Sequence, residues 1–359
     1  MKSLPLYKQI QQDIRRMITI GKLREGDRIP SEKELADTYH VSQITSKNAL
    51  IGLMEEGLLV RMQGKGTFVA KQQEHATFEV YKEEWNGLNA RSGRIGLILP
   101  TMKTKVDQRF LNYIEKYASQ YGFELMLRIT RESQEEESKV ISAFLQQGVD
   151  GIIIFPVENE MYNDSILRLS LDRFPLVLID RFLKEVKTYS VSSDNINGTC
   201  EAVSGLLDKG HHSIAFISPE ITNSVTDERA QGFEQAYLQR GQSIDKNIWC
   251  LLPLDTIVSG QAEDSILQFL RDNPHITAVF TANTELCGYT FRAACQLNKA
   301  IPNDLELITF DPPDLPGVSY IRQNEDEMCK VTLQLLLEQI EGKYEATRTI
   351  VPVTVIWNK

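Results

Sequence analysis

The chain has 359 residues, of which 42% are hydrophobic and 25% charged, a composition typical of a globular protein with two or three domains. No run approaches the ~18 apolar residues of a membrane span, and the N-terminal residues lack the apolar core of a secretory signal, so we expect a cytoplasmic protein. The five cysteines form no CxxC pair and His211-His212 has no second pair at ligand spacing. We therefore expect no disulfide framework, no metal site and no cofactor.

The net charge of −10 is unevenly distributed along the chain. Residues 1–71 carry 12 Lys and Arg against 8 Asp and Glu, a balance of +4. The remainder carries 27 against 41, a balance of −14. A basic N-terminal region followed by an acidic remainder indicates a polyanionic partner for residues 1–71 alone.

The first predicted elements are two short helices. Apolar residues spaced by three and four between residues 6 and 18 predict an amphipathic helix that stops at Gly21. Ser31 and Glu34 stand at the spacing of a capping box, in which each side chain bonds the backbone N–H of the other residue. This box predicts that a second helix begins after Ser31.

The next stretch, VSQITSKNAL (41–50), predicts a third helix, capped by Ser42 and ending at Gly57. Two β-prone runs then flank the turn QGKG and predict a hairpin. A polar helix face by itself is usually only solvated. Three helices closed by a hairpin within about 70 residues, however, are the layout of a winged helix-turn-helix, whose third helix reads base edges in the major groove. We therefore expect residues 1–71 to form an α+β DNA-binding domain of this kind.

Residues 72–92 have no clear period and are interpreted as a linker. From residue 93, apolar runs rich in β-branched residues alternate with helical stretches, a pattern typical of parallel sheets covered on both faces. The runs lie at residues 94–100, 123–129, 151–156, 175–180, 213–219, 249–254, 278–283 and 305–311.

These runs are too many for one compact open sheet, so residues 93–359 are expected to form two α/β lobes. The expected boundaries are residues 93–192 with 319–346 for the first lobe, and 193–318 with 347–359 for the second. Ligands of open parallel sheets bind beyond the carboxyl ends of the strands. Polar residues stand at those ends and suit a small polyhydroxylated ligand: Asp180-Arg181, Asp194-Asn195, Asn283 and Asp311.

Two stretches also resemble known families. Residues 4–70 resemble the DNA-binding domain of the GntR family through LYKQI, GDRIPSEKELA, VSQITSKNAL and GKGTFVA. Residues 93–359 resemble the effector domain of LacI/GalR regulators, which has a type I periplasmic-binding-protein fold, through VDGIIIFP, LVLIDR, SSDNING, RAQGF and ITFD. The pairing of the two resembles the arabinose repressor group.

The first resemblance implies a set of DNA contacts on the helices and on the wing. The family usually has Arg at positions 33, 43 and 47, where this chain has Lys, Gln and Lys. Gln pairs naturally with adenine, whereas Arg forks onto guanine, so we expect adenine under Gln43 where relatives prefer guanine. The lysines should anchor phosphates. The expected DNA-binding residues are Lys33, Ser42, Gln43, Thr45, Lys47, Gly64, Lys65 and Gly66.

The second resemblance implies an effector site. Arg229 and Asp311 suit sugar hydroxyls as donor and acceptor, and Phe110 would offer an apolar face to a sugar ring. The chain departs from the family pattern at two positions: Asp255 replaces a stacking aromatic, which favours a more polar ligand, and Asn283 is followed by Thr rather than Asp. The expected effector-binding residues are Phe110, Asp194, Arg229, Asp255, Asn283 and Asp311.

Simpler structural roles remain open for the same residues. Arg229 could lie on a helix surface, Asp194 and Asp311 could cap helices, and Phe110 could belong to the core.

The sequence therefore favours a sugar-responsive transcriptional repressor that a monosaccharide such as arabinose releases from its operator. We expect a homodimer, because a two-fold operator doubles the few base contacts of one head. An alternative is a DNA-binding regulator whose sensor domain binds a non-sugar ligand or a protein partner. A third hypothesis, an enzyme built on the α/β domain, lacks a recognisable catalytic constellation, so we expect no enzymatic activity.

Overall fold

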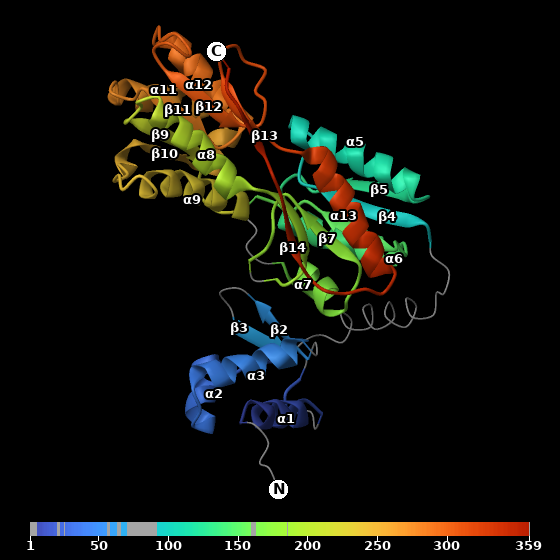
Figure 1. Ribbon diagram of the computed structural model, residues 1–359. Coiled ribbons are helices and arrows are strands. Elements are labelled where there is room, and N and C mark those ends of the chain that lie inside the picture. The colour runs from blue at the N-terminus through green and yellow to red at the C-terminus, as the bar shows by residue number, and fades with distance from the viewer. Residues whose placement is uncertain are drawn as a thin grey trace. The chain divides into compact units, whose positions relative to one another are not determined.

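The structure is a computed structural model that describes residues 6–19, 22–24, 26–55, 58–62, 66–69, 92–158, 163–184 and 186–358. The chain forms two compact units, Met1–Ala90 and Arg91–Lys359 (Figure 1). The expected linker at 72–92, except its last residue, lies outside the described residues, as do the wing residues Gly64 and Lys65.

The first unit contains the predicted helices and hairpin. The helices are α1 (Leu6–Thr19), α2 (Glu32–Tyr39) and α3 (Gln43–Glu55). The hairpin strands β2 (Leu59–Met62) and β3 (Gly66–Val69) pair antiparallel, which confirms the prediction. A strand of two residues, β1 (Arg28–Ile29), adds to β3 and gives the sheet order β1-β3-β2. Its shortness explains why no sequence period indicated it.

Packing in this unit follows the amphipathic pattern. The capping box is confirmed: Glu34 N donates to Ser31 Oγ at 3.3 Å, and Ser31 N donates to Glu34 Oε2 at 2.7 Å. Helices α1 and α2 both pack on α3. Apolar residues of all three helices and of the sheet share one core, namely Ile10, Ile14, Ile29, Leu35, Ala49, Leu50, Leu53, Leu59 and Val69.

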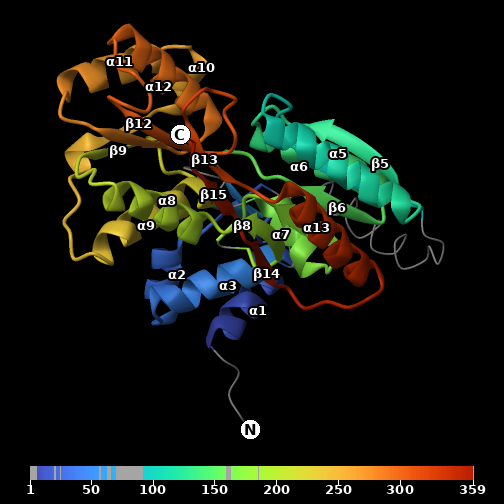
Figure 2. The same ribbon diagram turned by 45° about the horizontal axis from the view of Figure 1, so that its top comes forward.

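The second unit consists of two α/β lobes, each built on a six-stranded sheet (Figures 1 and 2). The first sheet has the order β14-β8-β7-β6-β4-β5, and its strand pairs are parallel. Its strands are β4 (Arg94–Leu99), β5 (Glu124–Ile129), β6 (Gly151–Ile154), β7 (Leu176–Ile179), β8 (Tyr189–Ser193) and β14 (Arg348–Val351). Its helices are α5 (Lys105–Gln120), α6 (Gln134–Gln146), α7 (Asp164–Leu171) and α13 (Glu325–Ile340).

The second sheet has the order β10-β9-β11-β12-β13-β15, parallel except for the last pair. Its strands are β9 (Ile214–Pro219), β10 (Trp249–Leu252), β11 (Ala278–Thr281), β12 (Glu306–Phe310), β13 (Ser319–Arg322) and β15 (Thr354–Ile356). The helical segments are α8 (Asn195–Asp208), α9 (Ser224–Leu238), η1 (Lys246–Ile248), α10 (Leu254–Val258), α11 (Ala262–Asp272) and α12 (Thr284–Gln296).

Helices cover both faces of each sheet. In the first lobe, one apolar cluster joins the sheet to α5 and α13, and a second joins it to α6 and α7. In the second lobe, α8 and α9 cover one face, and α11 and α12 cover the other. Strands β6 and β7 are buried at every residue. This burial confirms the expectation of parallel sheets covered on both sides.

The lobe boundaries expected from the sequence are wrong at two strands. Strand β13 was placed in the first lobe but pairs with β12 in the second sheet. Strand β14 was placed in the second lobe but pairs with β8 in the first sheet. The chain therefore crosses between lobes after β8, after β13 and after β14. A strand of four residues has no period by which its sheet can be assigned, so these crossings could not be located from the pattern.

Helices α8 and α9 pack closely because α9 carries a glycine at the contact. A Cβ atom on Gly232 would lie 2.4 Å from the backbone oxygen of Ile196 and 2.8 Å from Thr199 Cβ. Both atoms belong to α8, and a backbone oxygen cannot move away cheaply. Gly232 therefore sets the distance between the two helices, and with it the position of Arg229 one turn earlier on α9.

We predict that Gly232→Ala lowers the free energy of unfolding by about 1–3 kcal/mol, the usual cost of overpacking. Gly288→Ala is the matched control on α12, because its new Cβ meets nothing closer than Arg292 Nη1 at 3.5 Å. This control should raise the free energy of unfolding by up to about 1 kcal/mol through helix propensity. Urea unfolding measures both variants, and equal effects would contradict the packing argument.

Candidate functional site

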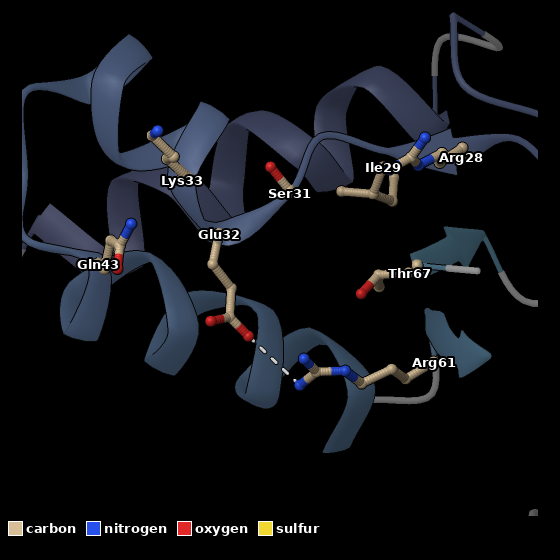
Figure 3. A pocket seen from close by; sticks show the side chains of 9 residues that line it. Arg28, Ile29, Ser31, Glu32, Lys33, Gln43, Arg61 and Thr67 are labelled. Carbon is tan, nitrogen blue, oxygen red and sulfur yellow. Dashed lines mark ion pairs between the residues drawn. The ribbon is translucent and has the colours of Figure 1, made fainter. Parts of the chain in front are cut away.

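The first unit has a hollow between α2, the start of α3 and the small sheet (Figure 3). Three of the expected DNA-contacting residues, Lys33, Gln43 and Gly66, lie on its wall. The sequence did not predict the other residues of the wall as DNA contacts. The full lining is Arg28, Ile29, Ser31, Glu32, Lys33, Gln43, Arg61, Gly66 and Thr67.

Helix α3 begins with a local hydrogen-bonding arrangement. Ser42 Oγ accepts from Thr45 N at 3.2 Å, and the two hydroxyl oxygens lie 2.8 Å apart. Ser46 is fully buried, and its hydroxyl donates to Glu32 O at 2.6 Å, which ties α3 to α2. Gln43 and Lys47 are exposed, as a reading helix requires. Ser42 and Thr45 thus have structural roles at the helix start, whereas Gln43 and Lys47 face solvent.

Cations dominate the hollow. Arg28, Lys33 and Arg61 line it, with Glu32 as the one carboxylate on its wall. Arg61 Nη1 lies 3.3 Å from Glu32 Oε1, with 58% of the arginine and 30% of the glutamate side chain exposed. Figure 3 shows this pair reaching across from β2 to α2. An ion pair at this exposure contributes little to stability, so Arg61 is held only weakly.

In the second unit, Arg229 is buried with 5% of its surface exposed. Its Nε donates to Asn195 Oδ1 at 3.0 Å, and its Nη1 donates to the backbone oxygen of Ala282 at 2.5 Å. Its guanidinium lies 3.6 Å from the ring centre of Phe310. The structure therefore excludes the surface role for Arg229 and places it at the carboxyl ends of β11 and β12.

Asp311, the residue after β12, is 8% exposed and lies beside Arg229. It accepts two hydrogen bonds from Gln323 Nε2, at 2.9 and 3.1 Å. Gln323 Oε1 in turn accepts from Ser193 Oγ at 2.5 Å. Ser193 ends β8 and Gln323 follows β13, so this chain of side chains joins two of the crossings between the lobes.

Burial shifts the pKa values of the charged groups in this cluster. It raises the pKa of Asp311 to about 7, although the neighbouring Arg229 and the Gln323 hydrogen bonds act in the opposite direction. Burial likewise raises the pKa of Asp180 at the end of β7, again against the attraction of Arg229. Burial lowers the pKa of Arg229 itself. The cluster therefore holds donors and acceptors at a high desolvation cost, as ligand sites commonly do.

The remaining expected effector residues divide into two groups. Asp194 caps α8, where it accepts from Asn197 N at 3.1 Å, and Asn283 caps α12, where it accepts from Leu286 N at 2.9 Å. Each is adjacent in sequence to a partner of Arg229, so both lie near the cluster. Phe110 is fully buried against Phe155 in the core of the first lobe, and Asp255 is exposed on α10, three strands away from β12.

The structure thus supports the core role for Phe110 and keeps Asp255 apart from the Arg229–Asp311 cluster. Three residues of the cluster were not assigned a role from the sequence: Asp180, Asn195 and Gln323. Asp180 and Asn195 were visible as polar residues at strand ends. Gln323 gave no signal, because its position depends on the crossing after β13.

Polar contacts bridge the two lobes close to the cluster. Arg181 pairs with Glu158, and Glu158 Oε1 accepts from Asn223 Nδ2 at 2.6 Å on the second lobe. Phe182 N donates to Ser224 Oγ at 3.0 Å. Water or ligand groups can replace such hydrogen bonds, but the Arg181 and Glu158 side chains are only 13% and 15% exposed, so this ion pair separates only when both charges find new partners.

Among the residues that the structure describes, no group of three or more His, Cys, Asp and Glu side chains is arranged to hold a metal ion. In the same part of the chain, no helix combines the length and apolar character needed to cross a membrane.

The first unit is a winged helix-turn-helix with a basic hollow. The second unit is a two-lobed α/β domain with a buried polar cluster at its crossings. Together they define a regulator that combines a DNA-binding unit with a ligand-binding unit. Residues 95–314 match the family described as "Periplasmic binding protein domain", and the chain belongs to this family. Residues 6–69 match "Bacterial regulatory proteins, gntR family". Both matches agree with the two expected resemblances.

Similar proteins cover nearly the whole chain. The arabinose metabolism transcriptional repressor of Halalkalibacterium halodurans is 24% identical over 334 residues, which are 91% of this chain and 86% of that protein. The ribose operon repressor of the same organism is 27% identical over 296 residues, covering 79% and 86%. The solved structure of the transcriptional regulator CelR–cellobiose complex has a TM-score of 0.65 at 21% identity, covering 91% of this chain and 98% of that one, and shares the fold.

We predict that Asp311→Asn removes a pH dependence of stability. Because the pKa of Asp311 is raised from 3.8 to about 7, the folded chain binds more protons than the unfolded chain between these values, and the free energy of unfolding falls as pH rises through this window. Relative to that of the parent, the free energy of unfolding of Asp311→Asn should therefore rise by about 2–3 kcal/mol when the pH is raised from 5 to 8.

Urea unfolding at the two pH values measures this gain. Asp264→Asn, an exposed carboxylate on α11, is the matched control and should show no such gain. A constant difference between Asp311→Asn and the parent at both pH values would contradict the burial argument.

Proposed function

We propose that the protein is a transcriptional repressor that binds operator DNA through its winged helix-turn-helix and is released by a monosaccharide such as arabinose. The observation that carries this proposal is the buried cluster that contains Arg229 and Asp311, a donor fork and an acceptor that act electrostatically on each other at the carboxyl ends of strands, beside the lobe crossings. The names of the two similar repressors, for arabinose metabolism and the ribose operon, support it.

The charges around this cluster favour an uncharged sugar over a sugar phosphate. Arg229 already faces Asp311 and Asp180, and Arg181 already pairs with Glu158 and lies 3.5 Å from Glu132. A phosphate would have to compete with these carboxylates for the two buried cations. Sugar hydroxyls both donate and accept, so they match carboxylates and guanidinium groups together.

Ligand binding is coupled to DNA affinity through the places where the chain crosses between the lobes. A ligand that changes the hydrogen bonds of Asp311 also acts on Gln323 and Ser193, which sit where the chain passes between lobes. Ligand and operator must then favour different lobe arrangements, because a ligand with equal affinity for both would shift nothing. The polar bridges between the lobes are suited to such a change.

We propose that the working form is a homodimer on a two-fold operator. Exposed apolar side chains at one edge of the second sheet support this. Leu251 on the edge strand β10 and Val258 on α10 are 39% and 77% exposed, and Ile221, which follows β9, is 37% exposed. These side chains are available to an interface between two copies of the chain.

The first test measures DNA affinity against sugar concentration. An operator selected from a randomised duplex pool should lose affinity for the full chain as the effective sugar is added. Arg229→Lys should keep operator affinity and weaken the sugar response, because it keeps a cation at this buried position and removes the planar donor fork. Thermal unfolding identifies the sugar, since a ligand at 100 times its Kd adds about 2.7 kcal/mol.

Two outcomes would overturn the sugar-responsive repressor. Saturating sugar that leaves operator affinity unchanged would refute the coupling. A screen in which no monosaccharide raises the unfolding temperature would favour a regulator whose sensor binds a non-sugar ligand or a protein partner.

The second test concerns base reading by α3. We propose that Gln43 reads adenine, whereas an arginine at this position would read guanine. Gln43→Arg should therefore change the preferred base at one operator position from adenine to guanine, by about 1–3 kcal/mol of discrimination. Binding to operators permuted at every base measures this change of base preference, and Lys47→Arg is the matched variant. An unchanged preference in Gln43→Arg would refute the reading role of Gln43.

A further inference from the structure

The first lobe contains a cavity of about 210 Å³ that shares no residue with the Arg229–Asp311 cluster. Its wall comes from the segment between β7 and β8, from β8 itself and from the start of the neighbouring strand β14 (Figure 2). The volume is several times the ~30 Å³ that one water molecule occupies in the liquid. The cavity therefore has room for a small group of atoms such as a phosphate with a short carbon chain.

The charged side chains on the wall of this cavity are cations. Lys184, Lys187 and Arg348 line it, and no Asp or Glu stands among the described residues that do so. Lys184 pairs with Asp227 on α9. Lys187 is exposed and pairs with no carboxylate in the part of the chain that the structure describes. The wall therefore carries a positive charge that no neighbouring carboxylate balances.

Ser190 adds a buried hydroxyl that lacks a partner. It pairs in register with Arg348 across β8 and β14, so the two side chains lie on the same face of the sheet. Only 4% of Ser190 is exposed, and its hydroxyl bonds no other residue that the structure describes. Buried hydroxyls are nearly always bonded, because desolvation without a hydrogen bond is costly. Since Ser190 lines the cavity, an acceptor bound there supplies the missing bond.

Arg348 is held in place with part of its guanidinium group unused. Its Nη2 donates to Ser192 Oγ at 3.2 Å and pairs with Glu228. Its Cζ lies 4.0 Å from the ring centre of Phe182. A guanidinium has five N–H groups, and those on Nε and Nη1 donate to no other residue in the described ranges. This planar edge matches two oxygens of a phosphate group.

We propose that the cavity is a second ligand site, separate from the sugar site, and that it binds a small phosphate-bearing anion. Arg348, Lys187 and Ser190 donate to the phosphate oxygens. A phosphate group offers several acceptor oxygens and between one and two negative charges near neutral pH, so it satisfies these three donors together. The apolar side chains of Leu183 and Val186 line another part of the cavity and suit the carbon atoms of a short phosphate ester.

A chain of polar contacts connects this cavity to the proposed sugar site. Arg348 pairs with Glu228 in the second lobe. Glu228 Oε2 accepts from Asn195 Nδ2 at 3.1 Å. Asn195 Oδ1 in turn accepts from Arg229 Nε at 3.0 Å.

The sign of the connection follows from charge. A phosphate on Arg348 repels the carboxylate of Glu228 and competes with it for the same guanidinium. Bound phosphate thus weakens a contact between the lobes that supports Asn195 and Arg229. Phosphate therefore lowers the affinity for sugar, and sugar lowers the affinity for phosphate by the same factor.

The first experiment is isothermal titration calorimetry of the full chain with inorganic phosphate and with glycerol 3-phosphate. Lys187→Gln and Ser190→Ala should each weaken binding by about tenfold, because each removes one donor to a charged oxygen. Lys330→Gln is the matched control, a half-exposed lysine on α13 outside the cavity, and should leave the affinity unchanged. Equal affinity for the two ligands supports a site for free phosphate, and tighter binding of glycerol 3-phosphate supports a site for a phosphate ester.

Urea unfolding without ligand separates binding from a structural role of Ser190. Because its hydroxyl has no partner, Ser190→Ala should leave the urea midpoint of the free chain unchanged or raise it. A lower midpoint would show that this hydroxyl supports the fold and would contradict its assignment to a ligand.

The outcomes distinguish this site from the proposed function. Absence of phosphate binding, or binding that neither Lys187→Gln nor Ser190→Ala weakens, would refute the site while the sugar-responsive repressor stands. Saturating phosphate should lower the affinity for the effective sugar by at least about fivefold, and an unchanged sugar affinity would refute the connection. If phosphate binds as predicted and no sugar binds, the sugar response fails and the phosphate site remains.

Discussion

The second unit depends on the burial of one cation, Arg229. A guanidinium removed from water is costly unless partners surround it. Here its hydrogen-bond partners are Asn195 at the start of α8 and the oxygen of Ala282 after β11, and the nearby carboxylate of Asp311 after β12 attracts its charge. These groups converge only if the strands keep their register and α9 packs closely on α8. The fold and the polar cluster therefore require each other.

The same cluster reaches the places where the chain passes between lobes. Asp311, Gln323 and Ser193 form one chain of hydrogen bonds, and Glu228 on α9 pairs with Arg348 on β14 in the other lobe. A group that binds Arg229 or Asp311 consequently acts on contacts shared by both lobes. In the first unit, by contrast, the charges lie near solvent, where they suit a polyanion and its exchange with counterions.

The sequence predicted the helices and strands whose apolar pattern is long, and it predicted the helix ends and turns that have characteristic residues. The capping box at Ser31, the hairpin and the alternating apolar runs belong to this class, because local interactions determine them. The short strands β13 and β14 had no period, so their lobes were assigned wrongly. Arg229 came from the family resemblance, and Asp311 came from both the resemblance and its place at a strand end. Gln323 could not be found, because the crossing after β13 brings it to Asp311. Phe110 was expected at the effector site but lies in the core. Its apolar side chain suits either place, and only the packing of the folded chain distinguishes the two roles.

The central claim is that Arg229 and Asp311 together hold the effector. The most direct measurement is a crystal structure of the full chain grown with the monosaccharide that most raises its unfolding temperature. The account predicts sugar hydroxyls at about 3 Å from the guanidinium of Arg229 and from the carboxylate of Asp311. A sugar bound elsewhere, with Arg229 and Asp311 bonded only to Asn195, Ala282 and Gln323 as they are here, would contradict it.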